Sequence, residues 1–186
     1  MGAQAGRRQG ERLDEILISS GYRPGAIGRI TELHAGYYHR HWGFGLYFER
    51  KVAAGLAEFL GRFDPARDGL WLALLGHEIV GSIVIDGAPA GEEGAHLRWF
   101  IVDPGQQGLG IGKRLLKSAL DFSRKCGFPR VHLWTFAGLD AARRLYETHG
   151  FVLRKEHEDR QWGVTCREQL FEWTPGCPSV LNGSGP

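Results

Sequence analysis

Hydrophobic side chains change their spacing along the chain in a way that predicts alternating helices and strands. After Pro24, and again between Glu49 and Phe63, apolar residues recur every three or four positions, which predicts two successive amphipathic helices. The side chains expected to face inward are Ile27, Ile30, Leu33 and Tyr37 on the first helix, and Val52, Leu56, Phe59, Leu60 and Phe63 on the second. Short apolar runs bounded by turn residues predict strands at residues 16–19, 70–75, 78–86 and 95–102.

The second half of the chain has a different pattern of apolar residues, in which helices and strands alternate. Helices are predicted over residues 108–126 and 140–149, and the strands expected around them cover residues 130–135, 151–158 and 166–173. A strand followed by a crossover helix and another strand places the two strands parallel in one sheet. The complete order, βααβββαβαββ, predicts a mixed α/β fold with one central sheet.

The two ends of the chain lack this periodicity. Residues 1–13 and 175–186 are expected to be loose segments on either side of a single domain at residues 14–174. With 186 residues, 42% of them apolar and 24% charged, the chain has the composition of one soluble globular domain. Cys126, Cys166 and Cys177 form no CxxC pair, which favours a reducing compartment.

Charge and hydropathy argue against several kinds of partner. The formal net charge is +2 and the basic residues are scattered, so no nucleic-acid-binding surface is expected. No apolar run approaches the roughly 18 residues of a membrane span, and the N-terminus lacks the apolar region of a signal peptide, so a cytoplasmic location is expected. A helix would turn His39 away from His34 and His41, so no metal site is expected.

Three glycines at positions 108, 110 and 112 carry the clearest chemical signal. They lie between a predicted strand and an amphipathic helix, where unpaired amide groups and the helix dipole favour an anion. Glycine also lets a phosphate approach the backbone closely. A Walker A loop would need glycine at Gln107 and a hydroxyl at Arg114, and a dinucleotide loop needs GxGxxG instead of GxGxG. The segment therefore predicts a different phosphate site, made of main chain.

This segment resembles the cofactor motif of GNAT acetyltransferases, Q/R-x-x-G-x-G/A, at Gln107, Gly110 and Gly112. Residues 97–104 (LRWFIVDP) look like the fourth strand of that family, and residues 142–151 (ARRLYETHGF) look like its AxxLYxxxGF segment. The resemblance covers residues 16–173. The stretches HWG, FDPAR and LWTF are similar to the acetyltransferase half of fusions that also carry a MarR-type winged-helix domain, for which the sequence shows no counterpart.

The resemblance implies a GNAT fold, a mostly antiparallel sheet whose fourth and fifth strands splay apart, and acetyl-CoA as the cofactor. Pantetheine would pair with the backbone of the fourth strand, and the pyrophosphate would lie on the glycine loop. The residues implied in cofactor binding are Phe100, Ile101, Val102, Gln107, Gly108, Leu109, Gly110, Ile111, Gly112, Lys113, Leu139, Asp140, Ala142 and Tyr146. Leu139 departs from the pattern, because the family often has a pantetheine-binding asparagine there.

Two residues are candidates for catalysis. The resemblance places Tyr146 beside the cofactor sulfur as a general acid, although an aromatic residue on an inner helix face would look the same in the sequence. An amine of pKa ~10.4 must also lose a proton before it attacks. His96, on the predicted fourth strand, is the candidate base, against a surface histidine or the rival bases Glu93, Glu49 and His157.

The sequence therefore predicts an N-acetyltransferase that moves an acetyl group from acetyl-CoA to a primary amine in a ternary complex. The alternatives are a non-catalytic acyl-CoA-binding module and a DNA-associated regulator. The acceptor is expected to be a small molecule or a peptide, with neither nucleic acid nor membrane as partner, and a homodimer is left open. Its cleft is expected from the first two helices and residues 158–165, with contributions from His41, Trp42, Tyr47, Phe48, Arg160 and Trp162.

Overall fold

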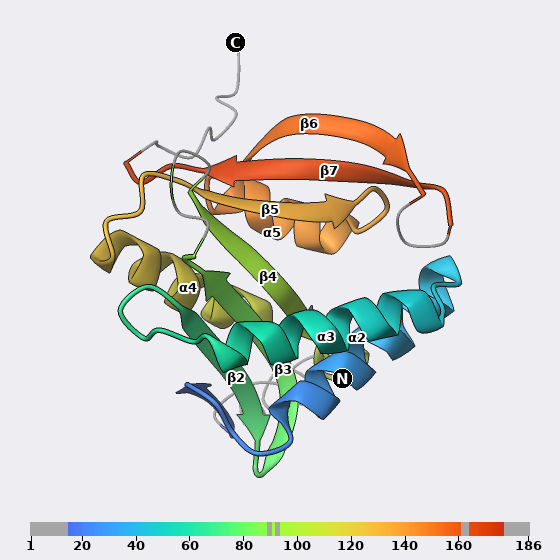
Figure 1. The fold of residues 1–186 in the computed structure, drawn as a ribbon, viewed down its shortest axis with the longest axis horizontal. Coiled ribbons are helices and arrows are strands. Elements are labelled where there is room, and N and C mark those ends of the chain that lie inside the picture. Colours follow the sequence, from blue (N-terminus) through green and yellow to red (C-terminus); the bar gives the residue numbers. More distant parts are fainter. Residues whose placement is uncertain (1–14, 89–90, 92–93, 161–163, 177–186) are drawn as a thin grey trace, which may run out of the picture.

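The computed structural model describes residues 15–88, 91, 94–160 and 164–176, which contain a seven-stranded sheet with helices on both faces (Figure 1). The strands are β1 (Ile16–Ser20), β2 (Gly69–Leu75), β3 (Glu78–Asp86), β4 (Ala95–Val102), β5 (Val131–Phe136), β6 (Val152–Asp159) and β7 (Cys166–Trp173). The helices are α2 (Ala26–Trp42), α3 (Leu46–Gly61), α4 (Ile111–Lys125) and α5 (Asp140–Thr148), with a 3-10 turn, η1, at Pro104–Gln106.

The order and type of these elements confirm the predicted mixed α/β fold. Two helices, α3 and α4, differ from their predicted bounds by more than one residue. α3 begins at Leu46 instead of Glu49, and its first turn adds Phe48, which is 5% exposed, to the buried stripe; the helix ends at Gly61, before Phe63. α4 begins at Ile111 instead of Gly108, because Gly108 and Gly110 have positive φ.

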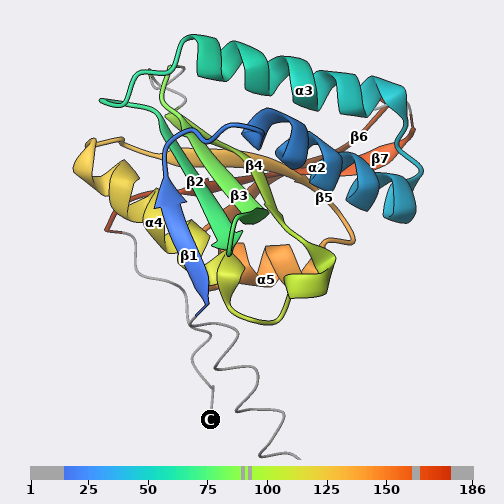
Figure 2. The same ribbon diagram turned by 90° about the horizontal axis from the view of Figure 1, so that it is seen from below.

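The helices form two layers, one on each face of the sheet (Figure 2). α2 and α3 cover one face and enclose a core that includes Ile30, Leu56, Phe59 and Phe136. α4 and α5 cover the other face, where Leu115 and Tyr146 pack against Phe171. No helix in the described part of the chain is both long enough and apolar enough to cross a bilayer.

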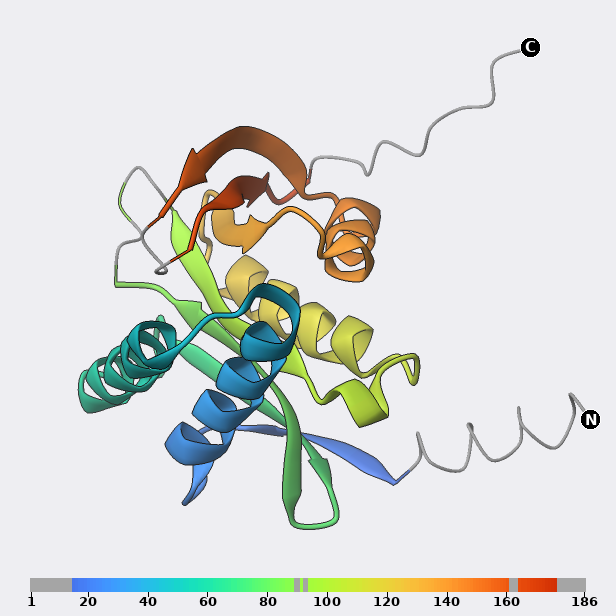
Figure 3. The same cartoon turned by 90° about the vertical axis from the view of Figure 1, so that its right-hand side faces the viewer.

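The sheet runs in the order β1-β2-β3-β4-β5-β7-β6, and its neighbours are antiparallel except for β4 and β5. These two parallel strands pair at Ala95 with Val131 and at His96 with His132, and then diverge (Figure 1). This confirms the splayed fourth and fifth strands. Figure 3 looks onto the splayed end, where α4 lies between α5 and the β2–β4 part of the sheet.

A bulge in β4 accompanies the divergence. Ser82 and Val84 of β3 pair with Ile101 and Arg98, so two residues of β4 lie opposite one residue of β3. One of the two is Trp99, which has φ 44°, a conformation that costs a non-glycine residue on the order of 1–3 kcal/mol. The Ser82 hydroxyl donates a hydrogen bond to the Trp99 carbonyl at 2.7 Å, which helps to hold the bulge.

Candidate active site

The N-terminus of α4 has the geometry of an anion-binding site. Gly110 caps the helix with φ 75°, and the Arg114 amide donates to the Gly110 carbonyl at 3.1 Å. A helix start leaves its first amide groups without intrahelical acceptors, so those of Ile111, Gly112 and Lys113 remain for a ligand. The first turn, which is fully described, carries no acidic side chain that would repel an anion.

A cavity of about 500 Å³ begins at this helix end and reaches Tyr146. It is lined by the residues that the resemblance assigns to the cofactor, with the exception of Leu109, and further by Tyr37, Tyr38, Gln106, Thr135, Gly138, Ala141 and Leu145. Leu109 instead packs, partly buried, against the apolar core. Leu139 and Asp140 are both in the lining.

Gly112 lies close to two neighbouring elements. A Cβ there would lie 3.3 Å from Cδ2 of Leu145 and 3.5 Å from Cζ of Phe100. The first contact is slightly tighter than ordinary van der Waals packing and the second is ordinary, so the first turn of α4 leaves little room for a side chain beside α5 and β4. The close approach and the amide groups fit a phosphate-containing chain that runs along β4.

A second cavity, also about 500 Å³, lies on the side of the sheet covered by α2 and α3. Its walls come from α2, α3, β4, β5, α5, β6 and β7, and its lining includes His34, Phe48, Val52, His96, Arg98, Trp134, Lys155, His157 and Glu168. The sequence-based cleft is only partly reproduced here. Phe48 lines the cavity, whereas His41, Tyr47 and Arg160 are exposed residues outside its lining, and Trp162 lies outside the described residues.

Four residues line both cavities: Tyr38, Phe100, Thr135 and Tyr146. Tyr146 is 5% exposed, and its ring centroid lies 6.0 Å from that of Phe100. Burial, with a contribution from Tyr38, raises the pKa of the Tyr146 phenol, so the hydroxyl stays protonated at neutral pH. Two separate cavities therefore meet at a protonated phenol.

Sequence reasoning missed Tyr38. Burial and the neighbouring Tyr37 raise the pKa of its phenol, so it is a second protonated hydroxyl at the junction. The helical pattern placed Tyr37 on the inner face, but Tyr38 follows the buried His34 by one turn of helix and packs on Phe48 and Phe136. The four-residue spacing from His34 was the available signal.

His96 lines the second cavity at the closed end of the splay. Its ring stacks on His132, the β5 residue with which it pairs, at a centroid distance of 4.5 Å. Burial, followed by His132 and Arg98, lowers the His96 pKa to about 3. The imidazole is therefore neutral at pH 7, but it is a much weaker base than a histidine in water.

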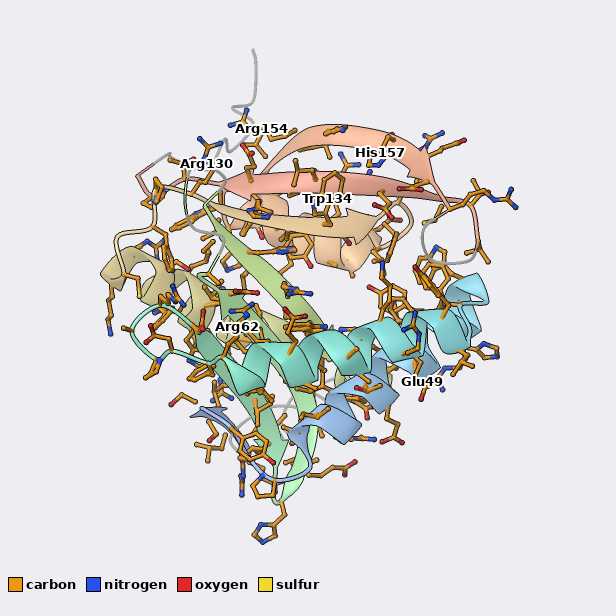
Figure 4. All side chains as sticks on the ribbon, viewed as in Figure 1. Glu49, Arg62, Arg130, Trp134, Arg154 and His157 are labelled. Carbon is orange, nitrogen blue, oxygen red and sulfur yellow. The ribbon has the colours of Figure 1, made fainter. Side chains whose placement is uncertain are left out.

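The rival bases lie in different surroundings. Glu49 is exposed on α3, and Glu93 lies outside the described residues (Figure 4). His157 lines the second cavity. Its neighbours Asp159 and Glu168 were not singled out from the sequence, yet one ligand atom from each of the three residues lies within 4.8 Å of the others. The alternation along β6, which puts His157 and Asp159 on one face, was the available signal, whereas the pairing of His157 with Glu168 is seen only in the fold.

The three clustered histidines of α2 do not form a common site. His34 is buried and donates to the Ile30 carbonyl at 2.8 Å, and burial lowers its pKa to about 4. His39 bonds instead to the Phe44 carbonyl at 2.9 Å. The ring of His41 instead lies against Tyr37 and Trp42, with centroid distances of 4.5 and 5.7 Å.

Comparison with known proteins connects this geometry to a family. The model of the acetyltransferase (GNAT) family matches residues 27–151. A mycothiol acetyltransferase from Acidothermus cellulolyticus is 34% identical over 123 residues, which are 59% of this chain and 34% of the relative. One from Nocardiopsis dassonvillei is 40% identical over 73 residues, 39% of this chain and 21% of the relative. The matches thus span only a minor part of these relatives.

Solved structures share the fold at low sequence identity. A GNAT-family acetyltransferase from Staphylococcus aureus aligns with TM-score 0.68 and 18% identity, covering 86% of this chain and 98% of that one. A Salmonella typhimurium structure solved with its cofactor acetyl-CoA aligns with TM-score 0.69 and 16% identity, covering 91% of this chain and 99% of that one. At these identities the likeness extends to the fold.

Proposed function

The chain belongs to the GNAT family of acetyltransferases, and we propose that it transfers the acetyl group of acetyl-CoA to a primary amine of a small molecule in a ternary complex. One observation carries the proposal: the cavity at the N-terminus of α4 and the cavity beside α2 and α3 meet at Tyr146. A donor in the first cavity and an acceptor in the second can react directly, since both reach the same phenol.

The first cavity binds acetyl-CoA through main-chain groups more than through side chains. The amides of Ile111, Gly112 and Lys113 bind the pyrophosphate, and the edge of β4 from Phe100 to Val102, beyond its pairing with β5, binds pantetheine. Acetyl-CoA supplies the thioester carbonyl and a thiolate leaving group. Leu139 offers no side-chain amide to pantetheine, so binding at the thiol end depends on backbone and apolar contacts.

Tyr146 acts at the leaving group. Its buried phenol is protonated at neutral pH and can donate a hydrogen bond or a proton to the departing sulfur. General acid catalysis of this kind contributes typically ~10²–10⁴-fold. The hydroxyl interacts with negative charge on sulfur, which develops only in the transition state. It therefore raises turnover more than it raises the affinity for acetyl-CoA.

The acceptor side must bind and deprotonate an amine. Removal of a proton from an ammonium of pKa ~10.4 at pH 7 costs about 4–5 kcal/mol. His96 faces this cavity and remains the hypothesised base, although its lowered pKa makes it weak. The relatives named mycothiol acetyltransferase support a small-molecule acceptor.

Cys126 and Cys166 are free thiols, which supports a reducing, cytoplasmic compartment.

The test is CoA release from acetyl-CoA, followed with a thiol reagent, with and without a panel of primary amines. An acetyltransferase shows amine-dependent release that falls sharply in the Tyr146→Phe variant. A non-catalytic acyl-CoA-binding module would bind CoA, seen as a thermal shift, and release thiol at the same slow rate whatever amine is present. That second result would overturn the proposed transfer.

A further inference from the structure

A buried carboxylate lies in the wall of the acceptor cavity. Glu168 on β7 is 3% exposed and lines the second cavity. It pairs with Phe136 of β5 on one side and with His157 of β6 on the other. The Phe136 ring lies 5.6 Å from that of Tyr38, one of the residues shared by the two cavities. Glu168 therefore lies near the place where donor and acceptor meet.

The groups around Glu168 are suited to a cation. His157 Nε2 lies 4.0 Å from the Asp159 carboxylate, and His157 Nδ1 is buried with no hydrogen-bond partner in the described part of the chain. The ring of Trp134 meets that of His157 edge-on at 5.4 Å, and Figure 4 shows both side chains on the face of the sheet that carries the cavity. The carboxylates of Glu168 and Asp159, the imidazole of His157 and the indole of Trp134 thus lie at the same end of the second cavity.

The positive charges at this cavity are placed differently. Arg98 donates to the buried Asp86 at 3.2 Å and lies 4.0 Å from the Trp99 ring centroid, so a carboxylate and an aromatic ring already hold its guanidinium. Lys155 also lines the cavity and is exposed on β6. Glu168 and Asp159 bring two carboxylates to the end of the cavity formed by β6 and β7.

We propose that Glu168 binds the ammonium group of the acceptor, with the face of Trp134 as a second contact, so that the cavity selects acceptors carrying a positive charge. An ammonium has three donors and no acceptor, whereas a carboxylate accepts only, so the two are complementary. An indole face adds attraction for the same cation. The inference rests on the proposed function, because it assigns the second cavity to the acceptor.

The experiment measures binding, so that it stays separate from acetyl transfer. The protein saturated with CoA is titrated calorimetrically with three amines and their neutral isosteres: tyramine and tyrosol, phenethylamine and phenethyl alcohol, 1,4-diaminobutane and 1,4-butanediol. Wild type should bind at least one amine ~10-fold or more tightly than its alcohol, the range expected for a hydrogen bond to a charged group. Glu168→Gln, which keeps the shape and removes the charge, should abolish that preference.

Glu172→Gln is the matched control. Glu172 is on the same strand and the same face, but it contacts Arg154 and Arg130 outside the cavity, so the preference should survive its neutralisation. Trp134→Leu changes an exposed ring and should reduce the preference ~2–5-fold, which provides a second variant if Glu168→Gln unfolds. Thermal melting and CoA affinity check the folding of each variant.

Three results would overturn the inference. In the first, no amine binds wild type more tightly than its alcohol. In the second, Glu168→Gln keeps the preference. In the third, EDTA removes the preference from wild type, which would mean that a metal ion on His157, Asp159 and Glu168 holds the ligand. Failure of acetyl transfer with intact amine binding would count against the proposed function alone.

Discussion

The Trp99 ring lies directly against Gly55: a Cβ at Gly55 would come within 3.0 Å of Cζ2 of the indole. Gly55 is in the middle of α3, and Trp99 is the residue of the β4 bulge with positive φ. Arg98 stacks on the same indole. The helix therefore makes room for a strained strand residue, and a glycine on one element helps to maintain the divergence of β4 from β5.

Gly55→Val should destabilise the protein by about 1–3 kcal/mol, the usual cost of overpacking. Gly36→Val on α2 is the control, because a Cβ there meets nothing within 4 Å. Urea unfolding of both variants measures the difference. Because valine has a higher helix propensity than glycine, propensity alone predicts no loss in either variant. If Gly55→Val is no less stable than Gly36→Val, the contact with Trp99 does not limit this position.

Gly112→Glu should abolish the thermal stabilisation produced by CoA. The new side chain would collide with Leu145 and Phe100 and would place a negative charge where the amides await a phosphate. Gly36→Glu introduces the same residue into open space on another helix and should keep the full shift. A wild-type protein that shows no shift at saturating CoA would contradict the assignment of the first cavity.

Tyr146→Phe should lower turnover by at least ~10-fold with little change in the affinity for acetyl-CoA, because the phenol acts on a thiolate absent from the ground state. Tyr38→Phe removes the other phenol at the junction of the two cavities and should lower turnover less than Tyr146→Phe does. Steady-state kinetics and CoA titrations separate the two effects. The reverse order of losses would transfer the role to Tyr38, and a loss of affinity alone would make Tyr146 a packing residue.

His96 and His34 should make the protein less stable in acid. Burial lowers both pKa values, to about 3 and about 4, so below pH ~6.5 the unfolded chain binds protons that the folded chain does not. Stability is therefore retained above pH ~6.5 and falls as the pH drops toward 4. His96→Asn should reduce the loss of unfolding free energy between pH 7 and pH 5 by up to about 2 kcal/mol. An unchanged loss would mean that His96 is protonated in the fold.

His96→Ala tests the hypothesised base. If His96 accepts the proton of the acceptor, the variant should slow strongly basic amines most and spare weakly basic ones, which already present a neutral nitrogen. Rate constants for a series of amines that differ in pKa provide the measurement. Equal losses across the series would indicate that His96 positions the acceptor, and no loss at all would remove it from the mechanism.

The sequence was sufficient for the parts of the molecule that depend on local pattern. Periodicity placed the helices and strands, and the glycines at 108, 110 and 112 indicated the turn that precedes α4, because backbone conformation acts over a few residues. The anion site at this turn stays a prediction. Tyr38 and Glu168 were missed for the opposite reason. Their role depends on which strands and helices become neighbours. The spacing of Tyr38 from His34 and the alternation along β6 indicate which residues share a face, but they do not indicate which cavity that face lines.

Both cavities reach Tyr146: the first extends from the N-terminus of α4, and the second lies beside α2 and α3. Figure 2 shows α4 on the opposite face of the sheet from α2 and α3. Each product can then leave by the route through which its parent substrate entered, so neither exit depends on the other being empty. Departure in either order is expected, with each product competing against its own parent in inhibition experiments. The arrangement also leaves room for a large acceptor. An elongated acceptor needs only its amine to reach the junction of the two cavities, while the rest of the molecule stays outside.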